Sequence, residues 1–141
     1  MSDADDIEAI RRRKREELLS QAAGGDGAEG DGGTPNEPVE IHGTEEFSAV
    51  VADSGVVLVD FHAEWCGPCQ MLAPVVTAVA ADSPATVAKV DIDRNRQIAM
   101  EYGVRSVPTL LLFADGEQVE RLVGMQDRTV LSDLIDRHAN R

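Results

Sequence analysis

Both cysteines of the chain, Cys66 and Cys69, lie in one short segment that reads AEWCGPCQ. Two thiols separated by a glycine and a proline can form half of a metal site or a redox pair. A disulfide across so short a loop adds little stability, because it restricts few residues of the unfolded chain. A disulfide that adds little stability is better suited to reversible formation and cleavage during a reaction.

A metal site within the chain receives little support from the remaining residues. Structural zinc usually requires four ligands, often two cysteine pairs or one pair with two histidines at set spacing. The chain has no second cysteine pair, and its histidines, His42, His62 and His138, form no HxxxH arrangement. We therefore predict no metal and no bound cofactor, although an iron–sulfur site that bridges two chains stays open on the spacing alone.

The composition changes near residue 40. Residues 24–38 read GGDGAEGDGGTPNEP, a stretch rich in Gly, Pro and acids that predicts a flexible linker. Before it, residues 6–20 can form a charged helix with a basic run, which either docks to a partner or is a solvated tail. We expect residues 1–38 to be largely disordered and residues 39–141 to form one domain.

Acidic residues outnumber basic ones by 26 to 13, which gives a formal net charge of −13. Such a surface disfavours non-specific binding to nucleic acid. Lys14 and Lys89 are the only lysines, and a surface rich in carboxylates and poor in lysine resembles that of proteins that function in concentrated salt. The alternatives are a halophilic protein and an ordinary acidic one.

The N-terminus begins MSDADDIEAI, which lacks the basic start and the apolar core of a secretory signal. No apolar run approaches the roughly 20 residues that span a bilayer. We therefore expect an intracellular, cytoplasmic protein that does not insert into a membrane.

From residue 39 onward, the pattern alternates strands with helices. Apolar runs rich in β-branched residues predict strands over Val39–His42, Val56–Phe61, Thr86–Asp93, Thr109–Phe113 and Glu117–Val123. Apolar periodicity and capping residues predict helices over Thr44–Asp53, Cys66–Asp82 and Arg94–Tyr102, and a last helix after Asp127. This order implies an α/β fold with a central mixed, mostly parallel β-sheet, helices on both faces and a final antiparallel hairpin.

Two finer features of the helices can also be predicted. Thr44 is a residue type that favours the N-cap position, where a side-chain oxygen accepts a backbone N–H. In the last helix, an apolar row should face the core, made of Val130, Leu131, Leu134 and Ile135.

The cysteine pair follows the predicted strand Val56–Phe61, at the end where reactive groups of open α/β sheets gather. At a helix N-terminus, free N–H groups and the macrodipole should bring the pKa of Cys66 below its ordinary value of about 8.5. Cys69 lies one turn further along, within reach of a mixed disulfide on Cys66. Pro68 suits the first turn because it needs no N–H there, and Gly67 leaves the sulfur accessible.

The segments VVLVDFHAEWCGPCQMLAP, KVDID, YGVRSVPTLLLF and LVG resemble, in order and spacing, those of the thioredoxin family. The resemblance runs from residue 39 to residue 140 and implies the thioredoxin fold. It also implies a thiol–disulfide oxidoreductase that reduces protein disulfides, with Cys66 as the nucleophile and Cys69 as the resolving thiol. The implied partners are disulfide-containing client proteins and a thioredoxin reductase, and we expect a monomer.

Asp60 lies inside the apolar run VVLVDF, where burial should raise the pKa of its carboxyl group. The resemblance implies that this carboxylate lies beneath Cys69 and exchanges a proton with it, with Lys89 as the neighbouring cation. The alternatives are an aspartate held by backbone hydrogen bonds and a lysine that merely extends to solvent.

The resemblance also implies a docking surface around the cysteines. Pro108 would be cis, would face the cysteine pair and would block metal binding there. The backbone of Val107 would then bond an extended client segment as a strand does. The surface would be completed by Trp65, Gly67, Pro68 and Gly124. Simple packing is the alternative for Trp65.

Two positions depart from the commonest family pattern. His62 stands where many members carry an aromatic residue such as Trp, and Gln70 stands where Lys or Arg often follows the second cysteine. A histidine near the thiols either titrates in the working range and shifts the redox potential or simply replaces a packing residue. Two other functions also stay open: a reductant or isomerase for a few clients, and a binding or chaperone module with idle cysteines.

Overall fold

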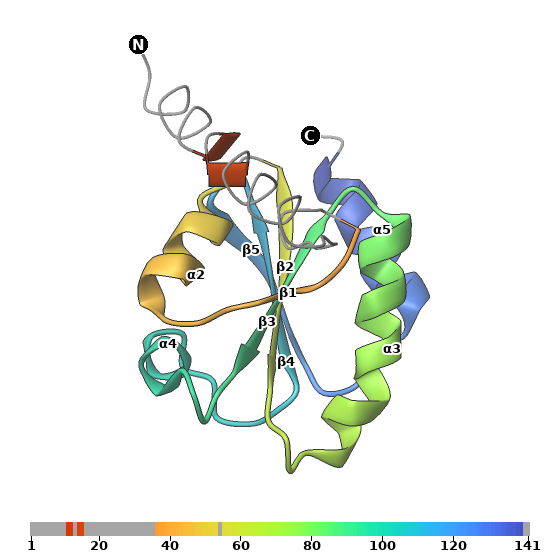
Figure 1. Ribbon diagram of the computed structural model, residues 1–141. Coiled ribbons are helices and arrows are strands. Elements are labelled where there is room, and N and C mark those ends of the chain that lie inside the picture. Colours follow the sequence, from red (N-terminus) through yellow and green to blue (C-terminus); the bar gives the residue numbers. More distant parts are fainter. Residues whose placement is uncertain (1–10, 13, 16–35, 54, 140–141) are drawn as a thin grey trace, which may run out of the picture.

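The computed structural model describes residues 11, 12, 14, 15, 36–53 and 55–139 (Figure 1). Of the predicted helix over 6–20, the structure describes only residues 11, 12, 14 and 15, which are helical. The other residues of that segment and most of the linker over 24–38 lie outside the described residues, so the predicted disorder of residues 1–38 stays a prediction. None of the described helices is both long and apolar enough to cross a membrane.

The described domain alternates strands and helices in the predicted order. Its strands are β1 (Val39–Glu40), β2 (Val56–His62), β3 (Thr86–Asp91), β4 (Thr109–Ala114) and β5 (Glu117–Val123). Its helices are α2 (Thr44–Val51), α3 (Gly67–Asp82), α4 (Arg96–Glu101) and α5 (Arg128–Ala139).

The strands form one sheet with the spatial order β1-β3-β2-β4-β5. β1 and β2 pair with β3 in parallel, whereas β4 pairs antiparallel with both β2 and β5. β1, β2, β3 and β5 therefore run in one direction and β4 in the other. The predicted mixed, mostly parallel sheet is confirmed.

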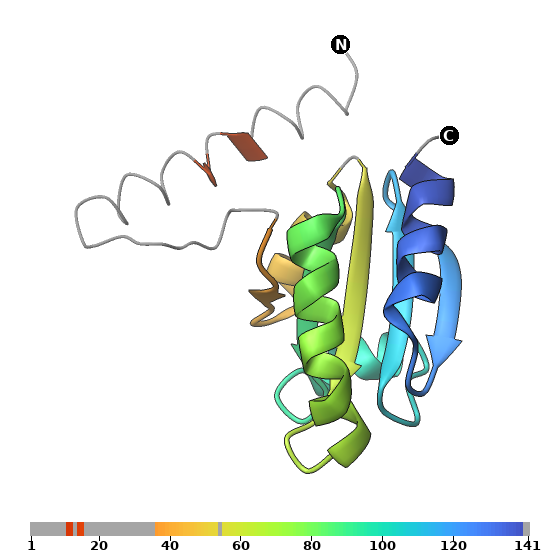
Figure 2. The same cartoon turned by 90° about the vertical axis from the view of Figure 1, so that its right-hand side faces the viewer.

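Helices cover both faces of the sheet (Figure 1), and α3 and α5 lie together on one of them (Figure 2). On that face, Val56 and Leu58 of β2 pack against apolar side chains of both helices. On the opposite face, Val57, Val59 and Phe61 pack against α2 and α4. Because both faces of β2 are buried, its sequence is an almost continuous apolar run. Each such side chain contributes about 1.5–3 kcal/mol relative to exposure.

The predicted cap at Thr44 is wrong. Gly43 occupies the N-cap position of α2 with a positive φ of 98°, and no side chain of the described residues caps this helix. The backbone N–H of Gly43 instead donates to Oδ1 of Asn95 at 2.9 Å. The Asn95 amide also donates to the carbonyl oxygens of Ile41 and Asp91. A buried asparagine from a distant turn therefore holds this turn, and Thr44 becomes the first helical residue.

The turn between β3 and α4 is longer than predicted, because β3 ends at Asp91 and α4 begins only at Arg96. The carboxylate of Asp91 accepts the backbone N–H of Asp93 at 2.9 Å, and the Asp91 carbonyl accepts the N–H of Asn95 at 2.9 Å. An aspartate that bonds the backbone two residues later favours a turn over a continued strand.

The predicted inner face of α5 is correct for Leu131 and Ile135, which are fully buried, and Leu134 packs against the same cluster. The prediction for Val130 is wrong, since this residue is 40% exposed. The narrow apolar stripe that meets α3 and the sheet is formed by Leu131, Leu134 and Ile135. Val130 lies beyond the edge of this stripe.

Candidate active site

The two cysteines lie where the chain passes from β2 into α3. Cys66 occupies the N-cap position of α3, and Pro68 lies in the first turn, as predicted. The backbone N–H of Cys69 donates to Sγ of Cys66 at 3.1 Å. A disulfide joins the two residues, whose Cα atoms are 5.3 Å apart. The first turn of α3 carries no acidic residue, so the positive end of the helix faces the Cys66 sulfur without competition.

The loop before β4 faces this pair. The Val107–Pro108 peptide bond is cis, as the family resemblance implies. The carbonyl oxygen of Val107 lies 3.7 Å from Sγ of Cys66. Gly124, which follows β5, donates its N–H to the Pro108 carbonyl oxygen at 2.8 Å and has a positive φ of 93°. The fold thus brings Val107, Pro108 and Gly124 to the cysteines from distant parts of the sequence.

Asp60 is buried in the sheet, with 1% of its surface exposed. It is paired in register with Lys89 on the neighbouring parallel strand, and Nζ of Lys89 lies 3.2 Å from Oδ2 of Asp60. Burial raises the pKa of Asp60, and the positive charge of Lys89 opposes this only in part. Oδ1 has no hydrogen-bond partner among the described residues. The predicted Asp60–Lys89 contact is confirmed, and the alternative of an aspartate satisfied by the backbone is wrong.

A cavity of about 300 Å³ lies beside the disulfide, and we call it the Lys89 cavity. Its lining includes Cys69 from α3, Lys89 from β3 and His62 from the end of β2. Gln70 also lines it, and the Gln70 amide donates to the carbonyl oxygen of Glu64 at 3.0 Å, which ties the loop after β2 to α3. The resolving cysteine and the partner of Asp60 therefore share one solvent-connected space.

Comparison with known proteins decides the family. Residues 38–137 match the family model described as Thioredoxin. The chain belongs to the thioredoxin family. A thioredoxin of Chlamydia pneumoniae is 50% identical over 102 residues, which cover 72% of this chain and 99% of that protein.

Solved thioredoxin structures agree with the fold. A mutant thioredoxin from Halobacterium salinarum superposes with a TM-score of 0.73 and 55% identity, covering 75% of this chain and 94% of that one. The thioredoxin of Fasciola hepatica superposes with a TM-score of 0.65 and 35% identity, covering 70% and 97%. The predicted thioredoxin fold is confirmed.

The family and the joined cysteine pair together establish the chemistry. This thioredoxin is a thiol–disulfide oxidoreductase and acts as a protein-disulfide reductase. The predicted activity is therefore confirmed over the alternative of a binding module with idle cysteines. Among the described residues, no group of three or more His, Cys, Asp or Glu side chains is placed to hold a metal ion.

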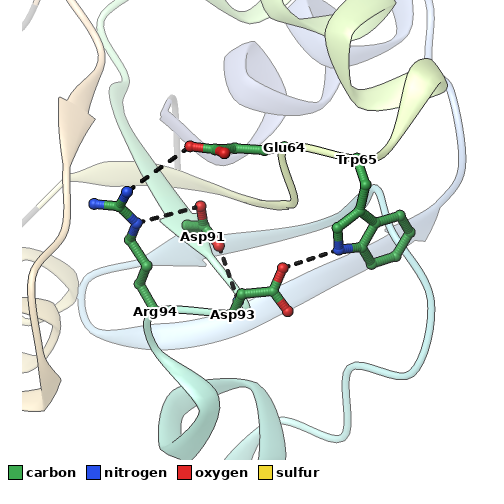
Figure 3. Close-up of a pocket in the computed structure, with 5 residues that line it drawn as sticks. All are labelled: Glu64, Trp65, Asp91, Asp93 and Arg94. Carbon is green, nitrogen blue, oxygen red and sulfur yellow. Dashed lines mark hydrogen bonds and ion pairs between the residues drawn. The ribbon is translucent and has the colours of Figure 1, made fainter.

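Trp65 lies at the surface of this thioredoxin, beside the disulfide, with 69% of its surface exposed. Simple packing in the core is therefore not its role. Its Nε1 donates to Oδ2 of Asp93 at 2.9 Å. A hollow of about 380 Å³, which we call the Trp65 pocket, is lined by Glu64, Trp65, Asp91, Asp93 and Arg94 (Figure 3).

Sequence reasoning missed two groups of residues at this surface. Asp93 fixes the Trp65 indole, yet in the sequence it is only one of the two aspartates in the stretch VDID. Val123 and Met125 flank Gly124 and are 59% and 45% exposed, although both are apolar. In the sequence, the signal for these two residues was their position on either side of Gly124, which the family resemblance places at the docking surface.

Proposed function

We propose that this thioredoxin reduces client disulfides by a two-step exchange. The Cys66 thiolate attacks one sulfur of the client disulfide, forms a mixed disulfide and releases the first client thiolate. Cys69 then attacks Sγ of Cys66, which forms the Cys66–Cys69 disulfide and releases the second client thiol. The observation that carries this assignment is the 3.1 Å hydrogen bond from the Cys69 N–H to Sγ of Cys66 at the start of α3, which stabilises a thiolate on Cys66.

Asp60 accepts the proton that Cys69 must lose before its attack, and Lys89 balances the single negative charge, which moves from the Asp60 carboxylate to the Cys69 thiolate. Burial supports this role, because the raised pKa of Asp60 brings the carboxyl group closer to the pKa of a thiol. The Lys89 cavity supports it as well, since Cys69 and Lys89 both line that space.

The client docks on the surface around Cys66. Val107 offers backbone groups to an extended client segment, and Pro108 and Gly124 shape the site beside it. Trp65 contributes an exposed aromatic face. Apart from its chain neighbours and its own helix backbone, an added Cβ at Gly67 would meet no atom of the described residues within 4 Å, so we assign the constraint on this position to the approaching partner. Pro68 completes the surface in the first turn of α3.

We further propose that a thioredoxin reductase supplies the two electrons that break the Cys66–Cys69 bond after each cycle. The chemistry fits the cytoplasm, where thiols are kept reduced. We propose a monomer, because the exposed apolar side chains at the disulfide serve transient clients. Residues 1–38 act as a charged tail to the domain of residues 39–141.

The net charge of −13 supports action in concentrated salt, and one of the structural relatives comes from Halobacterium salinarum. The free energy of unfolding, measured against potassium chloride concentration, tests this proposal. Stability should rise steeply with salt. A domain that is fully folded and active in dilute buffer would contradict it.

Covalent trapping tests the exchange mechanism. Cys66→Ser should abolish reduction, whereas Cys69→Ser should accumulate mixed disulfides with clients and with the reductase, which mass spectrometry can identify. Reduction by Cys66→Ser at the wild-type rate would overturn the assignment. Deletion of residues 1–38 serves as a separate test of the tail, and unchanged turnover with unchanged clients would leave it no catalytic role.

A further inference from the structure

Three neighbouring strands place a row of charged side chains on the sheet face that α3 covers. Glu40 of β1 is in register with Lys89 of β3, which is in register with Asp60 of β2. His62 follows Asp60 by two residues and therefore lies on the same face. Nε2 of His62 lies 3.7 Å from Oε2 of Glu40, and only 16% of the His62 side chain is exposed.

Two polar atoms in this row lack hydrogen-bond partners among the described residues, although both are buried. They are Oδ1 of Asp60 and Nε2 of His62, since 3.7 Å from Glu40 is too long for a hydrogen bond. Buried polar atoms are normally paired with protein or with ordered water. The Lys89 cavity, at about 300 Å³, is lined by His62 and has room for such water.

We propose that His62 is a positioning residue that passes the proton of Asp60 to solvent at the Lys89 cavity, with Glu40 as the ion-pair partner of the imidazolium. The inference rests on the proposed role of Asp60 as the proton acceptor for Cys69. In the resolving step, the Cys69 thiol gives its proton to Asp60. The proton then moves through water in the cavity to the imidazole, and the imidazolium releases it to bulk solvent. Only a proton moves along this route, while the electrons stay with the sulfur exchange.

The surroundings of His62 are mostly charged, which a residue used only for packing would not need. The titratable or charged groups that face it are Glu40 from β1, Asp60 from β2, Lys89 and Asp91 from β3, Glu64 from the following loop and Cys69 from α3. β4 contributes the apolar Leu110 opposite Asp60. Burial is the largest influence on the pKa of Asp60 and raises it, whereas a positive charge on His62 lowers it. The two groups therefore interact electrostatically.

Single-turnover reduction of insulin disulfides by the pre-reduced full chain tests the proposal across the neutral pH range. His62→Gln should slow the reaction roughly two- to fivefold, the range expected of a partly exposed charge contact. Glu40→Gln should also slow the reaction, by a smaller factor than His62→Gln does. In the Asp60→Asn background, His62→Gln should cause no further slowing. Without the Asp60 carboxylate, no proton reaches position 60 for His62 to pass on.

The chain offers a matched control in a second histidine–carboxylate pair. His42 and Glu46 lie 3.4 Å apart at the start of α2, where both side chains are well exposed. His42→Gln and Glu46→Gln should leave the rate and its pH profile unchanged. Slowing by these variants to the same extent would show a general charge effect and would overturn the role of His62.

The carboxyl carbon resonance of Asp60, followed by NMR in the oxidised protein, provides a readout that loss of packing would not mimic. In His62→Gln it should titrate at higher pH than in wild type, because a nearby positive charge has been removed. An unchanged titration, a wild-type rate in His62→Gln, or equal slowing with and without Asp60 would each overturn the proposal. Failure of the underlying mechanism is distinguishable, since Asp60→Asn alone would then show the wild-type pH profile.

Discussion

The Trp65 pocket and the Lys89 cavity lie at the same end of the sheet, and each contains or adjoins a buried aspartate. In the Trp65 pocket, the carboxylate of Asp91 accepts the N–H of Asp93 and lies 4.0 Å from Arg94. At the Lys89 cavity, Asp60 has one cation on Oδ2 and no hydrogen-bond partner for Oδ1 among the described residues. Two aspartates with similar burial therefore have opposite surroundings.

This difference shows that burial alone does not mark a functional carboxylate. Asp91 completes a turn, so its charge is matched by groups that the fold itself supplies. Asp60 lies in the middle of a strand whose other buried residues are apolar. The positive charge of Lys89 offsets only part of the cost of burying its carboxylate. A group that is costly to keep charged is also one that can change its protonation during a reaction.

The largest effect is expected from Asp60→Asn. The variant should slow the resolving step roughly 10- to 100-fold, at or below the usual contribution of general acid–base catalysis, because Cys69 loses its proton acceptor. The rate of disappearance of the mixed disulfide measures this step. Asp91→Ala is the matched control, since it removes the other buried carboxylate, and its resolving rate should stay within about twofold of wild type. Equal slowing in both variants would remove the contrast between the two regions.

The same substitution has a pH-dependent effect on stability. The folded pKa of Asp60 lies above its ordinary value of 3.8, so the folded state binds its proton more tightly than the unfolded state does. The stability contributed by this group is complete below about pH 3.8 and is lost as pH rises through the folded pKa. Asp60→Asn should therefore gain stability relative to wild type with rising pH, by about 1.4 kcal/mol for each unit of pKa elevation. A difference in the free energy of unfolding that is constant with pH would contradict this.

The second effect, in order of size, is a loss of stability in Asp91→Ala. The backbone N–H of Asp93 would lose its partner in the turn after β3, at a cost of roughly 1–2 kcal/mol. Urea denaturation at neutral pH measures this as a lower midpoint with an unchanged slope. Wild-type stability in this variant would show that Asp91 is as poorly compensated as Asp60.

Much of the architecture could be predicted because it depends on local patterns. The order of strands and helices, the cysteine pair at the end of β2 and the carboxylate inside VVLVDF follow from apolar periodicity and residue type. Lys89 could be assigned to Asp60 only through the family resemblance, since the register that joins them is a property of the sheet.

The features that were missed depend on contacts between distant segments. Asn95 holds the turn before α2, and Arg121 of β5 donates to the carbonyl oxygens of Tyr102 and Gly103 at the end of α4. Neither role has a signal in the neighbouring residues. The position of Asp93 under Trp65 is of the same kind, because the turn after β3 must first be in place.

A smaller effect is expected from Asp93→Ala, which removes the hydrogen bond that orients Trp65. Such a bond contributes about 0.5–1.5 kcal/mol, so the KM for a protein client should rise roughly 2- to 10-fold. The kcat should change little, because the cysteines and the Lys89 cavity are untouched. A matched control is Asp115→Ala, at the distant β4–β5 turn, for which we expect wild-type KM. A fall in kcat with unchanged KM would assign the Trp65 pocket to the chemical step.

The smallest effect is expected from Arg94→Gln. Arg94 lies 3.9 Å from Glu64 and 4.0 Å from Asp91, but its side chain is 74% exposed, so water screens both ion pairs. The free energy of unfolding should change by less than about 0.5 kcal/mol, and added salt should make the difference smaller still. A larger loss would mean that the charge of Asp91 depends on Arg94 rather than on the Asp93 N–H. The charge of each buried aspartate would then be offset by a single cation. The two sites would differ only in that Oδ1 of Asp60 has no hydrogen-bond partner among the described residues.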